Sequence, residues 1–274
     1  MTADLHCHSI YSDGTLTPKE LVDLAKKKGF AGLAITDHDT IEGFFDAAGY
    51  AAEQNIVLIP GVEISAHHQN ESVHVLGYSF DPKSPDLAAF CAIQRERRER
   101  RNEMILEKLG KAGMPLSMAE VKALSPHAEA YGRPHIALAM VQHGYVKDIM
   151  SAFNLYIGSS RSCYAAGEKW TVAEAIGAIQ QAKGKAVLAH PQLLKKTSLI
   201  AYLLSLPFDG IEAYYCCFFQ QTQEKWHQEA AKRGWFVTGG SDFHGAIHPD
   251  VSFGASYTPE DTFHMLHEHF LSHK

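Results

Sequence analysis

Short apolar runs alternate with amphipathic stretches through most of this chain. Seven runs have the length and apolar content of strands, namely residues 3–6, 31–36, 56–60, 73–80, 184–190, 209–213 and 235–241. Four other stretches have helical character, namely residues 41–55, 171–183, 218–233 and 259–271. Strands that alternate with helices are typical of a parallel α/β architecture, which we therefore predict.

The clearest helix start is the segment Thr17-Pro18-Lys19-Glu20. Thr17 is a favoured N-cap residue, Pro18 suits the first helical position, and Glu20 can complete a capping box with Thr17. The pattern predicts a helix that begins at Pro18 and ends at Gly29.

The alternation stops between residues 82 and 165. Three segments in this stretch have helical patterns and none resembles a strand; the helical segments are Arg95–Gly110, Met118–Ala123 and Pro134–Gln142. We therefore predict a barrel formed by residues 1–81 and 166–274, with residues 82–165 as a helical insert that covers its active site.

Composition narrows the class of protein. Of the 274 residues, 46% are hydrophobic and 20% are charged, which is ordinary for a globular domain. A net charge of −6 argues against a protein that binds nucleic acid through an overall basic surface. No apolar run reaches the ~18 residues of a membrane span. The five cysteines form no disulfide framework and the N-terminus has no signal-peptide pattern, so we expect a cytoplasmic protein.

The 17 histidines outnumber the 14 phenylalanines, and many follow the predicted strands. Six short segments carry them or nearby carboxylates, namely 4–13, 36–39, 61–65, 73–75, 188–191 and 239–244. A single histidine at a strand end usually makes only hydrogen bonds. In a parallel barrel, however, all strand ends of one kind open to one face, where active sites lie. The six segments together therefore predict a metal site.

The residue types indicate which metals this site prefers. Imidazoles mixed with carboxylates, without matching thiolates, suit Mn, Fe or Zn. His6 and His8 point to the same side of a strand, whereas Cys7 faces the opposite side and is predicted to lie in the core. The neighbouring carboxylates at positions 4, 37 and 39 are predicted to orient the histidines rather than to bind metal.

These motifs together resemble those of the polymerase-and-histidinol-phosphatase (PHP) family. The matching motifs are Asp-x-His-x-His, Thr-Asp-His-Asp, Gly-x-Glu, a strand histidine, Ala-His-Pro and Ser-Asp-x-His, within residues 1–80 and 184–257. The resemblance implies a distorted (β/α)7 barrel with a trinuclear metal site. It implies that two or three divalent ions bind, with Mn²⁺ favoured and Zn²⁺, Fe²⁺ or Mg²⁺ as alternatives.

The resemblance also assigns the ligands motif by motif. The first ion, whose bound hydroxide would attack the substrate, is held by His6, His8, Glu63 and Asp242. The second ion shares Glu63 with His74 and His190. The third ion is held by Asp13, His38 and His244.

Within the insert, the segment Gly132–Ala137 (GRPHIA) resembles the nucleotide phosphatase and exonuclease branch of this family. That branch implies a hydrolase acting on phosphate monoesters of nucleotides, such as 3′,5′-bisphosphonucleotides and AMP, or on short RNA 5′ ends. The implied substrate residues are Arg133, His135 and Arg161, the last in place of a lysine usual in the branch. Histidinol-phosphate phosphatase and a non-catalytic, metal-stabilised module are the alternatives. We expect no membrane association and no obligate protein partner.

Two basic features leave alternatives open. Arg133 precedes Pro134, which biases it toward an extended conformation and lets it reach a phosphate; a helix-start ion pair is the alternative. His135 either donates to the same phosphate or packs. The run Arg95–Arg101 holds five arginines in seven residues and forms either a solvated helix face or a basic lip for a polyanionic substrate.

Overall fold

The structure is a computed structural model that describes residues 2–69, 71–216, 218 and 220–273. Its strands are β1 (Ala3–Cys7), β2 (Gly32–Ile35), β3 (Val57–Leu58), β4 (Gly61–His68), β5 (Glu71–Tyr78), β6 (Trp170–Thr171), β7 (Lys185–Leu188), β8 (Gly210–Tyr215) and β9 (Phe236–Gly240). Its α-helices are α1 (Pro18–Lys28), α2 (Glu42–Glu53), α3 (Pro85–Lys111), α4 (Met118–Leu124), α5 (Arg133–Gln142), α6 (Ile149–Ala152), α7 (Val172–Gln181), α8 (Thr197–Leu203), α9 (Gln220–Arg233) and α10 (Glu260–Leu271). The predicted α/β class is confirmed.

The strands form two sheets. The smaller sheet has the order β1-β2-β3 and is parallel, while the larger has the order β6-β4-β5-β7-β8-β9. The expectation of an entirely parallel arrangement is wrong, because β5 runs antiparallel to both β4 and β7. Only a short connection separates β4 from β5 in the chain, and such a connection can join only antiparallel neighbours.

Backbone hydrogen bonds link the two sheets at both of their junctions. On one side, the amide of Glu63 donates to the carbonyl of Asp37 at 3.2 Å, and the amide of Asp39 donates to the carbonyl of Glu63 at 3.0 Å. On the other side, the amide of Asp242 donates to the carbonyl of His6 at 2.7 Å. The chain segments that carry the histidine motifs are therefore held side by side.

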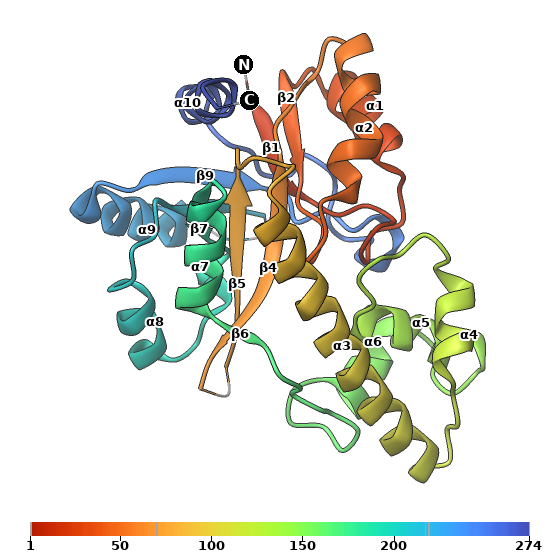
Figure 1. The fold of residues 1–274 in the computed structure, drawn as a ribbon. Coiled ribbons are helices and arrows are strands. Elements are labelled where there is room, and N and C mark those ends of the chain that lie inside the picture. Colours follow the sequence, from red (N-terminus) through yellow and green to blue (C-terminus); the bar gives the residue numbers. More distant parts are fainter. Residues whose placement is uncertain (1, 70, 217, 219, 274) are drawn as a thin grey trace.

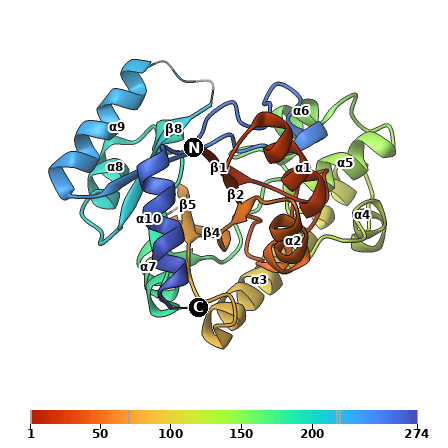
Figure 2. The ribbon, with the colours of Figure 1, turned by 90° about the horizontal axis from the view of Figure 1, so that it is seen from above.

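Helix α1 forms as its sequence predicts. The hydroxyl of Thr17 accepts a hydrogen bond from the amide of Glu20, and the carboxylate of Glu20 accepts one from the amide of Thr17. Gly29 ends the helix with φ of 74°, a left-handed conformation that costs glycine little. Helices α1 and α2 cover the small sheet, whereas α8 and α9 lie at the opposite side of the molecule (Figures 1 and 2).

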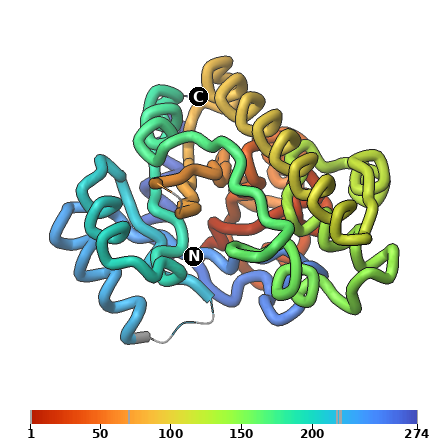
Figure 3. Tube along the Cα trace, turned by 90° about the horizontal axis from the view of Figure 1, so that it is seen from below, coloured from red at the N-terminus to blue at the C-terminus, as the bar shows by residue number. Residues whose placement is uncertain are grey.

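The insert has an apolar core of its own beside the cores that surround the sheets. This core is formed by α3 to α6 and includes Ile105, Val121, Ile136 and Met140. Helix α3 is longer than predicted and runs from the strands to the insert helices (Figures 1 and 3). Its first half contributes Leu87 and other residues to the core of the large sheet, so the start of the predicted insert packs with that sheet.

Several elements escape the sequence patterns. Strand β4 is absent from the predictions although its apolar and polar residues alternate as in a strand, because it directly follows the apolar run of residues 56–60. Helices α6 and α8 are absent because they are short. A π-helical turn, Phe153–Ile157, follows α6. Cys7 is fully buried, as predicted, and Cys216 is buried, while Cys217 lies outside the described residues. Among the described residues, no helix combines the length and the apolar character needed to cross a bilayer.

Candidate metal centre

The first cluster of ligand-type atoms forms around the end of β1. His6 and His8 alternate with the buried Cys7, so both rings point to the same side, toward β4 and β9. Their Nε2 atoms each lie 3.2 Å from Oδ1 of Asp242 and lie 3.5 and 3.2 Å, respectively, from Oε2 of Glu63. One ligand atom from each of these four residues lies within 4.8 Å of the others, which is the spacing of a shared ion.

Glu63 occupies the centre of the site. It lies inside β4, not beyond a strand end as expected, and it is buried. Its Oε2 faces His6, His8 and, at 3.2 Å, Nδ1 of His38. Its Oε1 faces Nδ1 of His74 at 2.8 Å and Nε2 of His190 at 3.1 Å. The two oxygens thus face different groups of imidazoles, an arrangement that fits a bridging carboxylate.

A further cluster surrounds Asp13. Its carboxylate lies 3.5 Å from Nε2 of His244, 3.9 Å from Nε2 of His38 and 3.6 Å from Nδ1 of His8. The rings of His8 and His244 stack with centroids 4.0 Å apart. His8 therefore borders two clusters rather than the one expected. All nine side chains expected at the metals are brought together in space.

Orphaned polar atoms test whether this site fits metal ions. Buried polar atoms in proteins almost always have hydrogen-bond partners. Here several buried atoms have none among the described residues, namely Nε2 of His6, Nε2 of His8, Oδ1 of Asp13, Nδ1 of His38 and Nδ1 of His190. Four of these five atoms belong to groups whose ligand atoms converge. Imidazole nitrogens and carboxylate oxygens that converge in this way are a suitable donor set for divalent cations.

The electrostatics keep the carboxylates ionised. Burial opposes ionisation of Asp13, Glu63 and Asp242, but the surrounding imidazoles outweigh burial and hold the pKa of each carboxyl well below its usual range. Burial also lowers the pKa of His6, but the carboxylates of Glu212, Asp242 and Glu63 outweigh it and raise that pKa well above the usual value. The three carboxylates are therefore ionised and available to a cation, which would compete with the protons on these imidazoles.

Two ligand-type residues have strained backbones. His190 has φ of 25° and Asp242 has φ of 54°, values that are uncommon for residues other than glycine. The amide of His190 donates to Oε2 of Glu212 at 2.8 Å, and that of Asp242 donates to the carbonyl of His6. Such strain persists where surrounding bonds determine the conformation, and it is concentrated at functional sites.

Sequence patterns did not identify Glu212 as part of this site. It is fully buried in β8, where one carboxylate oxygen accepts from Nδ1 of His6 at 2.9 Å and the other accepts from the amide of His190. On the same strand, the hydroxyl of Tyr215 donates to Oδ2 of Asp242 at 2.8 Å. A lone glutamate within an otherwise apolar strand was the available signal.

We expect Glu212→Gln to weaken metal binding by roughly 10- to 100-fold. Glutamine replaces one carboxylate oxygen, which accepts a hydrogen bond, with an NH₂ group, which donates. That NH₂ group would face another donor, either Nδ1 of His6 or the amide of His190. The measurement is metal content by elemental analysis after dialysis against graded chelator. Glu53→Gln, at an exposed position on α2, is the control. Unchanged affinity in the Glu212 variant would contradict this positioning role.

The carboxylates expected to orient the histidines act less directly. Asp4 accepts from the amide of His6 at 3.2 Å and from Ser241, so it positions backbone rather than rings. Asp37 accepts a hydrogen bond from the hydroxyl of Ser12 at 2.6 Å, and the hydroxyl oxygen of Ser12 lies 3.3 Å from Nδ1 of His8. Of the two, only Asp37 is connected to an imidazole ring, that of His8, and the connection passes through the side chain of Ser12.

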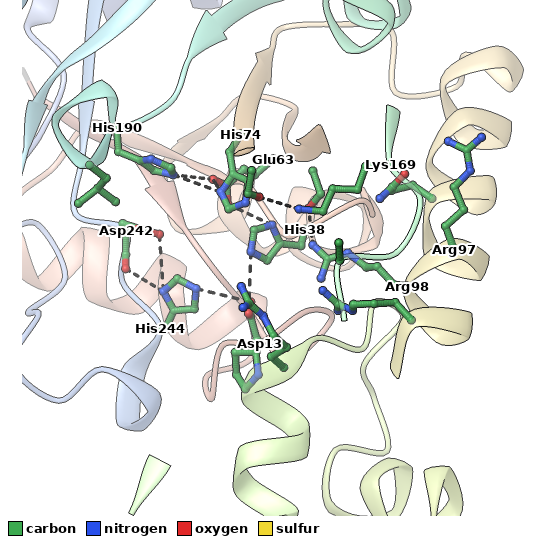
Figure 4. Close-up of a pocket in the computed structure, with 18 of the residues that line it drawn as sticks. Asp13, His38, Glu63, His74, Arg97, Arg98, Lys169, His190, Asp242 and His244 are labelled. Atoms are coloured by element: carbon green, nitrogen blue, oxygen red, sulfur yellow. Dashed lines mark hydrogen bonds and ion pairs between the residues drawn. The ribbon is translucent and has the colours of Figure 1, made fainter. Parts of the chain in front are cut away.

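Positive side chains line the wall opposite the histidine cluster in a cavity of about 230 Å³ (Figure 4). They are Arg97, Arg98, Arg101, Arg133 and Lys169. Arg98 and Arg101 are buried, and Nε of Arg98 lies 2.6 Å from Oδ2 of Asp39. The arginine run is therefore no uniformly solvated face, although Arg100 does form an exposed pair with Glu96.

This wall has more positive charge than its carboxylates neutralise. Burial, reinforced by Arg98 and Arg133, lowers the pKa of Arg101 to about 9. Burial and the nearby guanidinium groups lower the pKa of Lys169 to about 7. Its Nζ donates to Oγ of Ser72 at 2.7 Å. Crowded cations of this kind favour an anionic ligand, which would relieve their mutual repulsion.

The three predicted substrate residues have different outcomes. Arg133 lines the cavity, with its guanidinium carbon 5.6 and 5.5 Å from the ring centroids of Phe153 and Tyr164. It is the first residue of α5 rather than an extended residue before it, and Gly132 is the extended N-cap. The structure thus places Arg133 where a phosphate contact is feasible.

The other two residues are not placed for a phosphate contact in this structure. Nδ1 of His135 accepts from the amide of Gly132 at 2.9 Å, so Nε2 carries the proton and donates to the carbonyl of Ser12 at 2.8 Å. Both ring nitrogens are thus bonded to backbone, which favours the alternative that His135 packs. Arg161 is exposed in a turn that begins at Gly158 and does not line the cavity. Lys169, eight residues later, supplies the cation there.

Comparison with known proteins agrees with this geometry. The PHP domain model matches residues 4–186 of the chain. A 5′-3′ exoribonuclease of Haemophilus influenzae is 37% identical over 249 residues, which are 88% of this chain and 89% of that protein. A 3′,5′-nucleoside bisphosphate phosphatase of Chromobacterium violaceum is 34% identical over 246 residues, covering 88% and 86% of the two chains.

A solved structure extends the similarity to the fold. A protein of Bifidobacterium adolescentis assigned as a metal-dependent phosphoesterase superposes with a TM-score of 0.89 at 32% identity, covering 97% of this chain and 96% of that one. The family match spans more than half of the chain, and it includes six of the nine converging ligand-type residues. The chain belongs to the PHP domain family.

Proposed function

We propose that this protein is a metal-dependent phosphoesterase that hydrolyses phosphate esters of nucleotides. The observation that carries the proposal is a single cavity with metal-type ligands on one wall and five basic side chains, two of them buried, on the other. Relatives that are named as a nucleoside bisphosphate phosphatase and as exoribonucleases support the nucleotide substrate. Histidinol phosphate and a non-catalytic role are not favoured, because every expected ligand position is filled and these relatives are enzymes acting on nucleotides or RNA.

We further propose that two or three divalent ions bind, with Mn²⁺ favoured. His6, His8, Glu63 and Asp242 would hold the first. His74 and His190 would share Glu63 around the second, and Asp13, His38 and His244 would surround the third. Bound there, such ions would lower the pKa of water for attack on phosphorus and neutralise phosphoryl oxygens.

The protein's own groups would orient the substrate. Arg133 can offer two parallel N–H donors to phosphate oxygens, a geometry that lysine lacks. Lys169 adds a point charge at the same wall, and Tyr215 holds Asp242 in place through its hydroxyl. The fixed cations need little reorganisation when charge shifts among the phosphoryl oxygens.

A distorted barrel would account for how the ligands converge. We propose that the two sheets are parts of one such barrel. The backbone bonds between Asp37 and Glu63 on one side and between His6 and Asp242 on the other support closure. The bridges that pair Cys7 with Phe243 and His38 with Glu63 are both parallel, as barrel closure requires at these positions.

The proposal predicts phosphate release from nucleotides. We expect hydrolysis of 3′,5′-bisphosphoadenosine or AMP with Mn²⁺, and at least ~10-fold lower kcat/KM for histidinol phosphate, because the ammonium group of histidinol phosphate would meet the positive wall. The measurement is inorganic phosphate released from each substrate with Mn²⁺, Zn²⁺ or Mg²⁺. A preparation treated with chelator is the control. Preference for histidinol phosphate, or activity that survives complete metal removal, would contradict the proposal.

A further inference from the structure

Asp13 lies in a short loop after β1, residues 9–14, which we call the Asp13 loop. The amides of Ser12 and Gly14 both donate to the carbonyl of Ser9, at 3.1 and 2.9 Å. A Cβ atom at Gly14 would collide with the carbonyl of His8, so the loop folds closely against the end of the strand. These contacts fix the loop on the side of the small sheet.

The carboxylate of Asp13 faces His38 and His244 (Figure 4). Its Oδ1 is buried and has no hydrogen-bond partner among the residues that the structure describes. By contrast, Oδ2 of Asp242 accepts a hydrogen bond from the hydroxyl of Tyr215 at 2.8 Å. The direction of the Asp13 side chain therefore depends on the backbone that carries it.

That backbone is also fixed from the side of the predicted insert. Nε2 of His135 donates to the carbonyl of Ser12 at 2.8 Å. This carbonyl belongs to the planar peptide unit that contains the amide of Asp13, so a bond to its oxygen also fixes the plane that leads to Cα of Asp13. One residue earlier, the carbonyl of Tyr11 accepts from the amide of Glu129 at 2.8 Å. Two successive carbonyls of the Asp13 loop are thus bonded to the insert.

His135 is itself held in one orientation. Its side chain is buried, and its Nδ1 accepts from the amide of Gly132 at 2.9 Å. It lies in the first turn of α5, two residues after Arg133. Arg133 lines the cavity of about 230 Å³ beside the metal-type ligands, which we call the metal-side cavity. One helical turn therefore carries both a cation that lines this cavity and the donor that fixes the Asp13 loop.

We propose that His135 is a positioning residue for metal binding, which aims the Asp13 carboxylate by fixing the peptide between Ser12 and Asp13. The ion that benefits is the one that Asp13, His38 and His244 would surround, so the inference rests on the ligand set of the proposed function. A carboxylate that must be ordered when the ion binds costs conformational entropy, whereas one held in place beforehand does not. The alternative is that His135 only docks the insert on the rest of the chain.

Two substitutions separate the two hydrogen bonds of His135. In His135→Asn, the side chain is long enough to accept from the amide of Gly132 but too short to donate to the carbonyl of Ser12. In His135→Gln, the longer side chain can present its NH₂ group to Ser12. We expect the asparagine variant to bind one Mn²⁺ ion more weakly by on the order of 10- to 100-fold, and the glutamine variant to retain most of the wild-type affinity.

The measurement is titration of protein stripped with chelator, followed by electron paramagnetic resonance, which detects free Mn²⁺. This readout does not depend on turnover. Release of phosphate from 3′,5′-bisphosphoadenosine provides a second readout. The Mn²⁺ concentration that gives half-maximal activity should rise in His135→Asn, and excess Mn²⁺ should restore most of kcat. A general packing defect would instead lower kcat at every Mn²⁺ concentration.

His143→Asn is the matched control. His143 lies at the other end of α5, where its Nε2 is 3.4 Å from Oε1 of Glu120 and its side chain is 34% exposed. This variant should bind Mn²⁺ as the wild type does. Circular dichroism and melting temperatures would verify that the variants fold. If His135→Asn does not fold, His135→Leu also removes the donor to Ser12 while filling a similar volume.

Three outcomes would overturn the inference. The first is wild-type Mn²⁺ affinity in His135→Asn. The second is equal weakening in His135→Asn and His135→Gln, which would show that the shape of the ring matters rather than its bond to Ser12. The third is a loss of kcat that excess Mn²⁺ does not restore. Failure of the proposed function would be seen separately, as a wild type that binds Mn²⁺ but releases no phosphate from any nucleotide.

Discussion

Replacement of Glu63 by glutamine should lower kcat by ~10²-fold or more and reduce bound metal. Its two carboxylate oxygens face different imidazole groups, so an amide nitrogen in place of either oxygen removes a ligand from one group. The loss should therefore exceed that of a residue that serves one ion. The measurements are kcat with saturating Mn²⁺ and metal content by elemental analysis, with two or three ions expected in the wild type.

Glu96→Gln is a suitable comparison for Glu63→Gln. Glu96 lies on α3, its side chain is 70% exposed, and its pair with Arg100 has an N–O distance of 3.9 Å. Its loss should change neither metal content nor kcat noticeably, because exposed pairs contribute little. Turnover and metal content near the wild-type values in Glu63→Gln would remove this residue from the site.

Arg133→Ala should reduce kcat/KM by roughly 30- to 1000-fold, equivalent to about 2–4 kcal/mol of transition-state binding. Its guanidinium group lies beside two aromatic rings, and burial lowers its pKa, so a phosphate would meet a partly desolvated cation. Metal content should not change, because Arg133 is not among the converging ligand groups. Arg133→Lys should restore only part of the activity.

Arg100→Ala serves as the reference for the arginine variants. Its side chain is 58% exposed on α3 and does not line the metal-side cavity. Its effect on kcat/KM should stay within about twofold, since exposed ion pairs are weak. The phosphate-clamp role is wrong if Arg133→Ala keeps full activity, or if it loses metal together with activity.

The sequence predicts those helices and strands whose formation depends on residues close together in the chain. The capping box of Thr17 and Glu20 and the buried run in β2 depend only on neighbouring residues. The direction of β5 depends on its partner β4, whose alternating residues Val62, Glu63 and Ile64 are typical of a strand but directly follow the apolar run of residues 56–60. The register and direction of a strand are set by the strand with which it pairs, so the sequence of one segment alone does not determine them.

The candidate site divides in the same way. The ligand-type residues could be predicted because their motifs recur at strand ends, although their role as ligands stays a prediction. Glu212 and Lys169 escaped because each belongs to no motif and gains its role from contacts with distant residues. His135 belongs to a motif, but the amino-acid sequence alone does not reveal that both of its ring nitrogens form hydrogen bonds with the backbone.

Helix α3 ties the two parts of the chain into one cooperative unit. Its 27 residues span about 40 Å and include Leu87 in the core of the large sheet and Ile105 in the core of the insert. Between these ends, Arg98 pairs with Asp39, which follows β2. Removal of the insert would cut a continuous helix. It would also leave the buried carboxylate of Asp39 without its partner Arg98. The insert is thus not an interchangeable module, and thermal denaturation should proceed without a stage in which it alone has melted.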